Sequence, residues 1–210
     1  KHTLEDNGLV RSTQMDALEL LDYQENIKKI VIGVPELDEL LGGGMTPESL
    51  YEVYGEFGSG KTQFSLTACA NVLARGKNVV WFDCEDTFKP QRLVDIIVNR
   101  GLRETQEEAK LLLKNITYRH TPNTEDYELE EGRITEHLIE GNTELIVIDG
   151  VIGQYAEEYL GRGTLSVRQN KLRRVMTHLK NLSFYFKCTV LFTNQVQTDP
   201  SVMFGDPVKP

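Results

Sequence analysis

The sequence is poor in cysteine and has no apolar run long enough to cross a membrane, which argues against a membrane protein. Its three cysteines, Cys69, Cys84 and Cys188, lie far apart in apolar stretches and lack the spacing of a metal site. The start, KHTLEDNG, lacks the apolar core of a signal peptide. We therefore expect buried thiols in a reducing, intracellular compartment, cytoplasmic in a prokaryote or nuclear in a eukaryote.

Acidic residues are absent from residues 159–197, although the whole chain carries a net charge of −9. That overall charge argues against a generally basic nucleic-acid-binding protein. The acid-free segment nevertheless carries several cations: Arg162, Arg168, Lys171, Arg173, Arg174, Lys180 and Lys187. On charge alone, it is equally compatible with the solvated face of a helix and with a binding surface.

Apolar runs that alternate with amphipathic stretches predict one α/β domain with a mostly parallel sheet covered by helices on both faces. The 210 residues, 40% hydrophobic and 26% charged, suffice for the core of such a soluble domain. Strands are predicted at 28–33, 49–54, 77–86, 115–120, 143–149 and 188–195. Helices are predicted at 13–26, 34–41, 61–74, 87–101, 126–140 and 167–186, with a glycine stop at 42–44.

The segment YGEFGSGKTQ, residues 54–63, fits the pattern G-x-x-x-x-G-K-[ST] between a predicted strand and a predicted helix. Glycines let the backbone curl so that its N–H groups can surround a phosphate chain. Lys61 would reach the β- and γ-phosphates, and the Thr62 hydroxyl would bind Mg²⁺. The loop predicted to hold the nucleotide comprises Gly55, Glu56, Phe57, Gly58, Ser59, Gly60, Lys61, Thr62 and Gln63. An ordinary glycine turn is the alternative interpretation.

Polar residues follow the other predicted strands at the sheet edge where ligands bind in parallel sheets. Asp149 is predicted to hold Mg²⁺ through water, and Glu85 to orient and partly deprotonate the water that attacks the γ-phosphate. Gln195 could hydrogen-bond the γ-phosphate and signal its presence to the next loop. Arg92 could lay its guanidinium on a base. For Asp149 the alternative is a loop-capping carboxylate, and for Glu85 a plain surface acid.

Together these segments resemble the RecA-like recombinases, specifically their RadA branch. The shared segments occur in that family's order over residues 17–210: LDELLGGG, YGEFGSGKTQ, FDCEDTFKPQRL, LIVIDG, YLGRGTLSVRQNKL and TNQV. The resemblance implies a RecA-like ATPase core with sheet order 3-2-4-5-1, and ATP and Mg²⁺ as ligands of the residues named above. It also implies Arg92 against adenine.

The resemblance further implies that Arg162 and Arg168 lie in and beside a first DNA-binding loop, with a second loop from Val196 through MFGDPVKP. Such recombinases polymerise on single-stranded DNA with ATP at subunit interfaces. Residues 1–33 would be a linker and oligomerisation segment, and 34–210 the core, cut short on its C-terminal side. The expected partners are single-stranded DNA and a filament of this chain or of a related recombinase, with no membrane.

The sequence departs from the family pattern at several positions. Gln14 stands where the interlocking Phe-x-x-Ala motif has phenylalanine, with Ala17 as its alanine. Ala156, followed by Glu157 and Glu158, stands where the first DNA loop often has arginine. The connection from the loop helix to NVVWFD is short. Because the family's remaining strands are absent, the strand at 49–54 would form an unpaired edge, and we expect either a fragment of a longer protein or a covering partner.

Two functions remain open from the sequence. The first is an ATP-dependent recombination and repair enzyme, a DNA-dependent ATPase that forms filaments on single-stranded DNA. The second is an accessory paralogue that binds ATP and a partner filament without strand exchange of its own, which the family departures favour. A KaiC-like regulatory ATPase shares the core, but the segment GRGTLSVRQ and the acid-free segment disfavour it.

Overall fold

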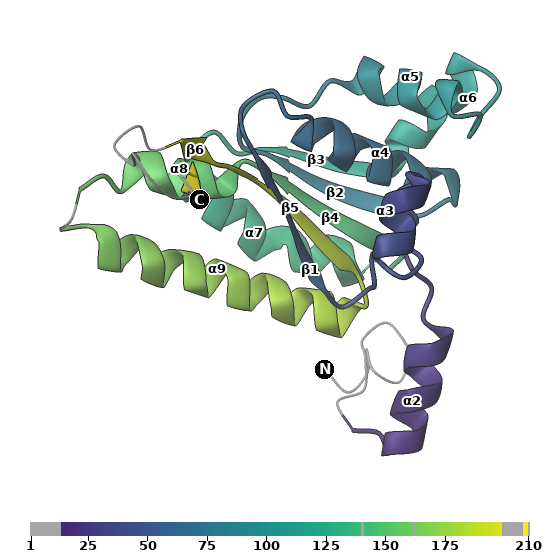
Figure 1. Ribbon diagram of the computed structural model, residues 1–210, viewed down its shortest axis with the longest axis horizontal. Coiled ribbons are helices and arrows are strands. Elements are labelled where there is room, and N and C mark those ends of the chain that lie inside the picture. The colour runs from purple at the N-terminus through teal and green to yellow at the C-terminus, as the bar shows by residue number, and fades with distance from the viewer. Residues whose placement is uncertain (1–13, 140, 162, 199–207, 210) are drawn as a thin grey trace.

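The computed structural model describes residues 14–139, 141–161, 163–198 and 208–209. Its centre is a five-stranded parallel sheet in the order β1-β5-β4-β2-β3, between two layers of helices (Figure 1). The strands are β1 Leu50–Gly55, β2 Asn78–Asp83, β3 Ile116–His120, β4 Thr143–Asp149 and β5 Thr189–Gln195. A separate antiparallel pair joins β6 Gln197–Thr198 to β7 Val208–Lys209. The predicted parallel sheet, its strand order and the position of β1 at its edge are confirmed.

Eight α-helices lie within the described residues, and none of them is long and apolar enough to cross a membrane. They are α2 Ala17–Asn26, α3 Pro35–Leu40, α4 Lys61–Ala74, α5 Pro90–Asn99, α6 Gln106–Leu112, α7 Thr124–Ile139, α8 Val151–Glu158 and α9 Leu165–Phe186. Helices α6 and α8 were not predicted from the sequence patterns. A capping box of Thr105 and Glu108 begins α6, and this T-x-x-E pattern is a signal that could have found it.

The core consists of two apolar clusters, one on each face of the sheet. Residues of the strands contribute alternately: Trp81 and Val147 pack with α4 and α5, whereas Phe82 and Ile148 pack with α7, α8 and α9. Both faces are therefore buried, which explains why the inner strands are continuous apolar runs. The sheet is consequently held rigidly, and its carboxyl ends have fixed positions relative to one another.

The predicted strand at 28–33 is wrong. This segment forms only an isolated bridge between Ile30 and Met45. Side chains, and not a neighbouring strand, bind its backbone further on: the Asp38 carboxylate accepts the N–H groups of Ile32 and Gly33, both at 2.8 Å. A backbone whose polar groups are satisfied in this way has no need of a sheet partner.

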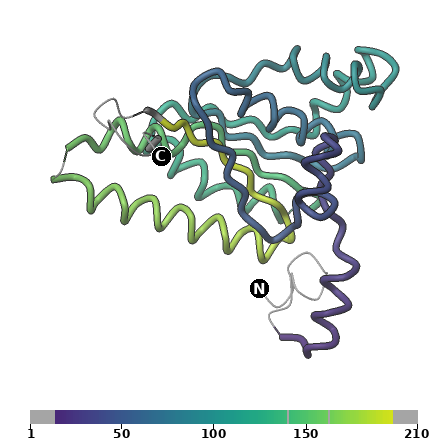
Figure 2. Tube along the Cα trace, viewed as in Figure 1, coloured from purple at the N-terminus to yellow at the C-terminus, as the bar shows by residue number. Residues whose placement is uncertain are grey.

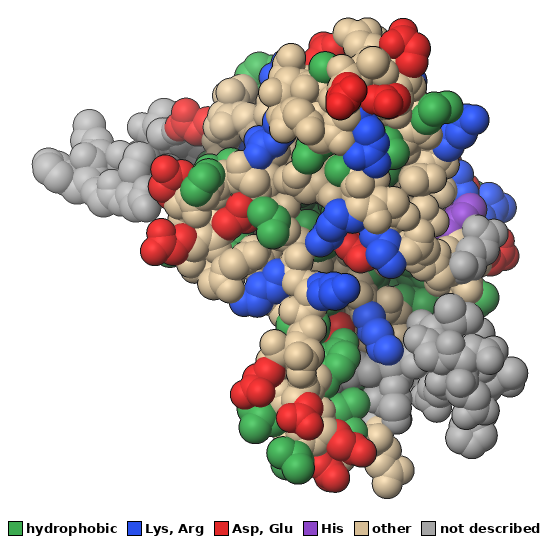
Figure 3. Space-filling view, turned by 90° about the vertical axis from the view of Figure 1, so that its right-hand side faces the viewer, with side chains coloured by type: hydrophobic (Ala, Val, Ile, Leu, Met, Phe, Trp, Pro, Cys, Tyr) green, Lys and Arg blue, Asp and Glu red, His purple; other side chains and the backbone are tan. Residues whose placement is uncertain are grey.

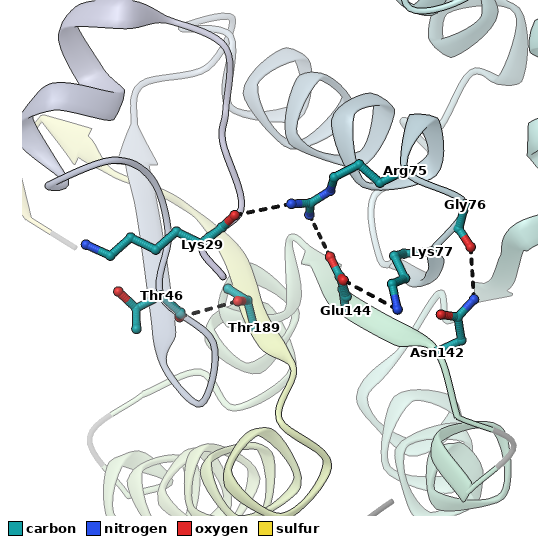
Figure 4. A network of polar contacts seen from close by, with 8 residues as sticks. All are labelled: Lys29, Thr46, Arg75, Gly76, Lys77, Asn142, Glu144 and Thr189. Carbon is teal, nitrogen blue, oxygen red and sulfur yellow. Dashed lines mark hydrogen bonds and ion pairs between the residues drawn. The ribbon is translucent and has the colours of Figure 1, made fainter. Parts of the chain in front are cut away.

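Lys and Arg side chains gather on the face that contains the amino ends of the strands (Figure 3). Several of them bind groups at the ends of secondary structure (Figure 4). Arg75 lies 2.6 Å from Glu144 and also donates to the Lys29 carbonyl, and Lys77 lies 3.8 Å from Glu144. Asn142 donates to the carbonyl of Gly76, just past α4. These contacts tie the chain before α3, the end of α4 and the start of β4 into one unit.

Helix α2 stands apart from the sheet (Figures 1 and 2). Asp16 and Glu19 form a capping box at its start, which explains why the helix begins at residue 17. The predicted helix is thus confirmed over most of its length. The apolar residues whose spacing predicted this helix are nevertheless not buried: Leu18 is 67% exposed and Leu21 is 50% exposed. The Tyr23 hydroxyl nevertheless donates to Glu48, so α2 does contact the core.

A buried carboxyl lies between α7 and α9. Glu131 is 9% exposed, and its Oε1 is 3.9 Å from His178 Nε2, too far for a hydrogen bond. Within the described structure neither atom has a hydrogen-bond partner. Burial, with a smaller contribution from Glu128, raises the pKa of Glu131 from 4.5 to about 7. Burial alone lowers the pKa of His178.

We predict that Glu131→Gln makes stability less dependent on pH. Because the folded pKa of Glu131 is raised, this group stabilises the fold below pH 4.5, and that stability is lost as pH rises to about 7. This pKa shift corresponds to about 3 kcal/mol of unfolding free energy. Urea unfolding at about pH 5 and about pH 8 measures the change, and the variant should be the more stable protein at the higher pH. Equal pH slopes in both proteins, which share His178, would contradict the prediction.

Candidate active site

The loop from Gly55 to Lys61 lies between β1 and α4, at the carboxyl edge of the sheet. Gly58 and Gly60 have φ values of +75° and +93°, a left-handed backbone that favours glycine. A Cβ on Gly55 would lie 2.6 Å from Ser59 Oγ, so a side chain there would force the Ser59 side chain to move. Residues 56–60 are exposed, and the loop is therefore open to a ligand.

Lys61 lies across this loop. Its ammonium donates to the carbonyls of Gly55 and Glu56, both at 3.0 Å. Lys61 also begins α4, whose first turn has free N–H groups and a partial positive charge. Backbone donors, a lysine and a helix N-terminus together make a site for an anion, and their arrangement fits a phosphate chain.

Asp149 ends β4 and is the central acid of the site. Its side chain is 1% exposed, and three hydroxyls donate to it. Oδ2 accepts from Thr62 at 2.9 Å and from Thr87 at 2.9 Å, and Oδ1 accepts from Thr193 at 2.5 Å. Thr62 comes from α4, Thr87 from the β2–α5 connection and Thr193 from β5. A buried carboxylate that is hydrogen-bonded on both oxygens keeps one orientation.

The oxygen atoms around Asp149 suit Mg²⁺. Magnesium prefers oxygen ligands, keeps several waters and is bound through one or two carboxylates together with substrate phosphates. Asp149 and the Thr62 hydroxyl, 2.9 Å apart beside the phosphate loop, supply this kind of donor set. No cluster of three or more His, Cys, Asp or Glu side chains occurs in the described part of the chain, so it holds no cage made of such side chains alone.

Glu85 follows β2 and lies against Gly150, the residue after Asp149. A Cβ on Gly150 would be 2.4 Å from Glu85 Cγ, and Gly150 has a φ of +98°. Residue 85 is exposed as a whole, but its carboxyl group is partly buried, and this burial raises the pKa of Glu85. The charge of Asp149 raises this pKa further. The charge of Lys61 lowers this pKa by a smaller amount. A carboxylate with a raised pKa is a better proton acceptor.

Gln195 and Arg92 also lie at this edge. Gln195 ends β5 in register with Gly55, and the next residue, Val196, donates its N–H to the Gly55 carbonyl at 3.2 Å. Arg92, in the first turn of α5, donates from Nε to Gln63 Oε1 at 2.7 Å. The structure thus brings every predicted nucleotide-site residue to one edge of the sheet.

Some residues of the site were missed in the sequence. Thr87 and Thr193 are two of them, and Asp83 is the third. Asp83 is fully buried and accepts the N–H groups of Thr87 and Phe88. Its Oδ2 also accepts the Tyr118 hydroxyl at 3.0 Å. Two signals in the sequence point to Asp83: it ends an apolar run, as Asp149 does, and it precedes Thr87 by four residues, as in a side-chain-capped turn.

The acid-free segment forms much of α9, on the opposite layer from α4 (Figure 1). Arg168 lies in the first turns of α9 and is partly buried, whereas Arg162 lies outside the described residues. Lys171 forms an ion pair of 2.7 Å with Glu128 of α7 and lies over the ring of Tyr159 at 5.5 Å. At least one cation of this segment therefore has a partner within the fold. Counting charges in the sequence could not separate such a cation from one that is free to bind a ligand.

We predict that Thr193→Val destabilises the fold by roughly 1.5–3 kcal/mol, because it removes a hydrogen bond to a buried carboxylate while keeping the side-chain shape. Thr177→Val is the matched control, since that exposed hydroxyl bonds only the carbonyl of Arg173 within α9. The control should change stability by less than about 0.5 kcal/mol in denaturant unfolding. Equal losses would show that Thr193 does not support Asp149.

Comparison with known proteins agrees with this geometry. The Rad51 family model matches residues 23–210. The chain is 37% identical to the DNA repair and recombination protein RadA of Cenarchaeum symbiosum, over 99% of this chain and 52% of that protein. It is also 37% identical to the DNA repair and recombination protein RadA of Methanoculleus marisnigri, over 91% of this chain and 63% of that protein. The chain therefore spans about half to two thirds of the length of these relatives. On its sheet, its motifs and these matches, the chain belongs to the Rad51 family of RecA-like proteins.

Proposed function

We propose that this chain is the nucleotide-binding core of a DNA repair and recombination protein that hydrolyses ATP in a RadA-like filament on single-stranded DNA. The observation that carries the proposal is the grouping of the phosphate loop, Asp149 and Glu85 at one edge of the sheet. The names of both RadA relatives support the recombination and repair role. The intracellular location expected from the sequence belongs to the same proposal.

ATP binds through the loop at residues 55–63. The loop N–H groups and Lys61 hold the phosphates, and Lys61 exchanges its two backbone carbonyl partners for phosphate oxygens. Thr62 and Asp149 would hold Mg²⁺, which would neutralise charge on the phosphate oxygens. Arg92, held by Gln63, lies against adenine.

Hydrolysis uses Glu85 as the proton acceptor. Its carboxylate takes a proton from water as the water oxygen bonds to the γ-phosphorus, and the bond from that phosphorus to the bridging oxygen of ADP breaks. The raised pKa of Glu85 makes its carboxylate the stronger proton acceptor in this step. Gln195 binds the γ-phosphate, and because it precedes β6 it passes the loss of phosphate to the segment that follows.

Single-stranded DNA binds along the acid-free segment, with Arg162 and Arg168 on its phosphates. Residues 1–33 link this chain to the next subunit, and 34–210 form the ATPase core. Support for the DNA surface comes from the absence of acid over 159–197. Contacts between arginine and phosphate hold the DNA backbone and carry no information about the base sequence.

An accessory paralogue that binds ATP and a partner filament is the second candidate. Glu157 and Glu158 favour it, because they place negative charge beside the expected DNA loop. Glu158 is held there: its carboxylate accepts the N–H and hydroxyl of Thr124 at the start of α7. Gln14, in place of the expected phenylalanine, also favours a partner that supplies the missing contact.

The test is steady-state ATP hydrolysis by the full-length protein, with and without single-stranded DNA, over a range of protein concentrations. Lys61→Ala should abolish nucleotide binding, because the phosphates lose their cation. Glu85→Gln should retain nucleotide affinity and lose turnover by on the order of a hundredfold, because it loses the proton acceptor.

Stimulation by DNA that rises cooperatively with protein concentration supports the filament ATPase. Slow hydrolysis that is indifferent to both supports the accessory paralogue. Should Glu85→Gln hydrolyse ATP at the wild-type rate, Glu85 is not the proton acceptor.

Arg168→Ala should weaken single-stranded DNA binding equally for all sequences and lower its salt dependence, because it removes a phosphate-contacting cation. Lys114→Ala is the control, since it removes an exposed cation just before the amino end of β3. Fluorescence anisotropy with two oligonucleotides of different sequence, at several salt concentrations, measures both effects. Identical DNA affinity in the two variants would make α9 a solvated face.

A further inference from the structure

The backbone just before Glu85 is held from two sides. The Cys84 N–H donates to the Asp149 carbonyl at 3.0 Å, which ties it to β4. The Cys84 carbonyl accepts from Gln154 Nε2 at 3.0 Å, which ties it to α8. The first contact is part of the sheet, whereas the second depends on one side chain.

Gln154 is a polar side chain in a buried position. It is 8% exposed, between the fully buried Val151 and Tyr155 of α8. Its Nε2 also donates to the Thr121 carbonyl at 2.6 Å, just past β3. Since both partners are carbonyl oxygens, the nitrogen of the amide must face them. Its Oε1 is buried and, in the described structure, has no hydrogen-bond partner. An amide that remains half unsatisfied in an apolar site costs stability, so packing alone does not explain it.

The same helix is fixed to the layer that carries the cations. The Tyr155 hydroxyl donates to Glu128 Oε1 at 2.8 Å, and Lys171 of α9 binds the same oxygen at 2.7 Å. Through Glu128 of α7, helix α8 is therefore connected to α9, and through Gln154 to the peptide before Glu85. In Figure 1, α8 lies next to the carboxyl ends of the strands, with α7 and α9 on one side.

We propose that Gln154 is a positioning residue that aligns Glu85 for proton transfer by holding the peptide between Cys84 and Glu85 against α8. This inference rests on the proposed ATP hydrolysis and concerns what positions Glu85 in the same site. Loss of the amide lowers turnover and leaves the phosphate loop, and with it nucleotide affinity, unchanged.

The test compares Gln154→Met with Tyr155→Phe in the full-length protein. Methionine keeps the length of the side chain and removes both donors. Tyr155→Phe removes one hydrogen bond from the neighbouring residue of α8 and leaves the Cys84 contact in place. For Gln154→Met we expect kcat to fall about tenfold or more with KM for ATP within about twofold, and the acid limb of the pH–rate profile to move. For Tyr155→Phe we expect basal kcat within about twofold of wild type.

Amide hydrogen exchange of the ATP-bound protein supplies a measurement that needs no turnover. Gln154→Met should lose protection in the peptide that contains Cys84 and Glu85, and Tyr155→Phe should retain it. Unchanged kcat and unchanged protection in folded Gln154→Met would overturn the proposal, as would equal effects in both variants. A wild-type protein that binds but does not hydrolyse ATP refutes the proposed function, and the exchange difference then still decides whether Gln154 holds this peptide.

Discussion

The carboxylate of Asp149 is the constraint on which the site depends. Burying a charge at the end of the central strand is costly unless both oxygens are hydrogen-bonded, and here hydroxyls of three different elements supply those bonds. Thr62, Thr87 and Thr193 therefore fix the positions of α4, the β2–α5 connection and β5 relative to β4. The loop at residues 55–61 leads directly into α4, so the bond from Thr62 also sets the distance between Asp149 and this loop.

The parallel sheet brings these elements together before any side chain acts. Asp83, Asp149 and Thr193 lie side by side in register on β2, β4 and β5, and Gly55 is in register with Gln195. Apolar clusters on both faces hold the strands in that register. A slip of one residue would turn each of these polar groups to the opposite face, at the cost of burying it without partners.

Helix α8 lies between the candidate nucleotide site and helix α9, which carries much of the acid-free segment. It follows its N-cap Gly150, whose missing side chain leaves room for Glu85, and it ends at Glu158, which binds the start of α7. Between them, Gln154 reaches the backbone before Glu85 and Tyr155 reaches the acid that pairs with α9. Hydrogen bonds of this one short helix therefore reach both the peptide before Glu85 and, through Glu128, helix α9.

The sequence by itself determined the inner strands, most of the helices and the phosphate loop, because periodicity and glycine spacing are local properties of the chain. The inner strands, α4, α5 and α9 follow from such patterns, and so do Lys61 and Thr62. Only the tertiary structure decided which groups share a hydrogen bond across the chain. It joined Thr193 to Asp149, placed Gln154 behind Glu85, paired Lys171 internally and satisfied the segment at 28–33 without a strand. Contacts between residues far apart in sequence leave no periodic trace, since they depend on how elements pack and not on the order of residues within any one of them.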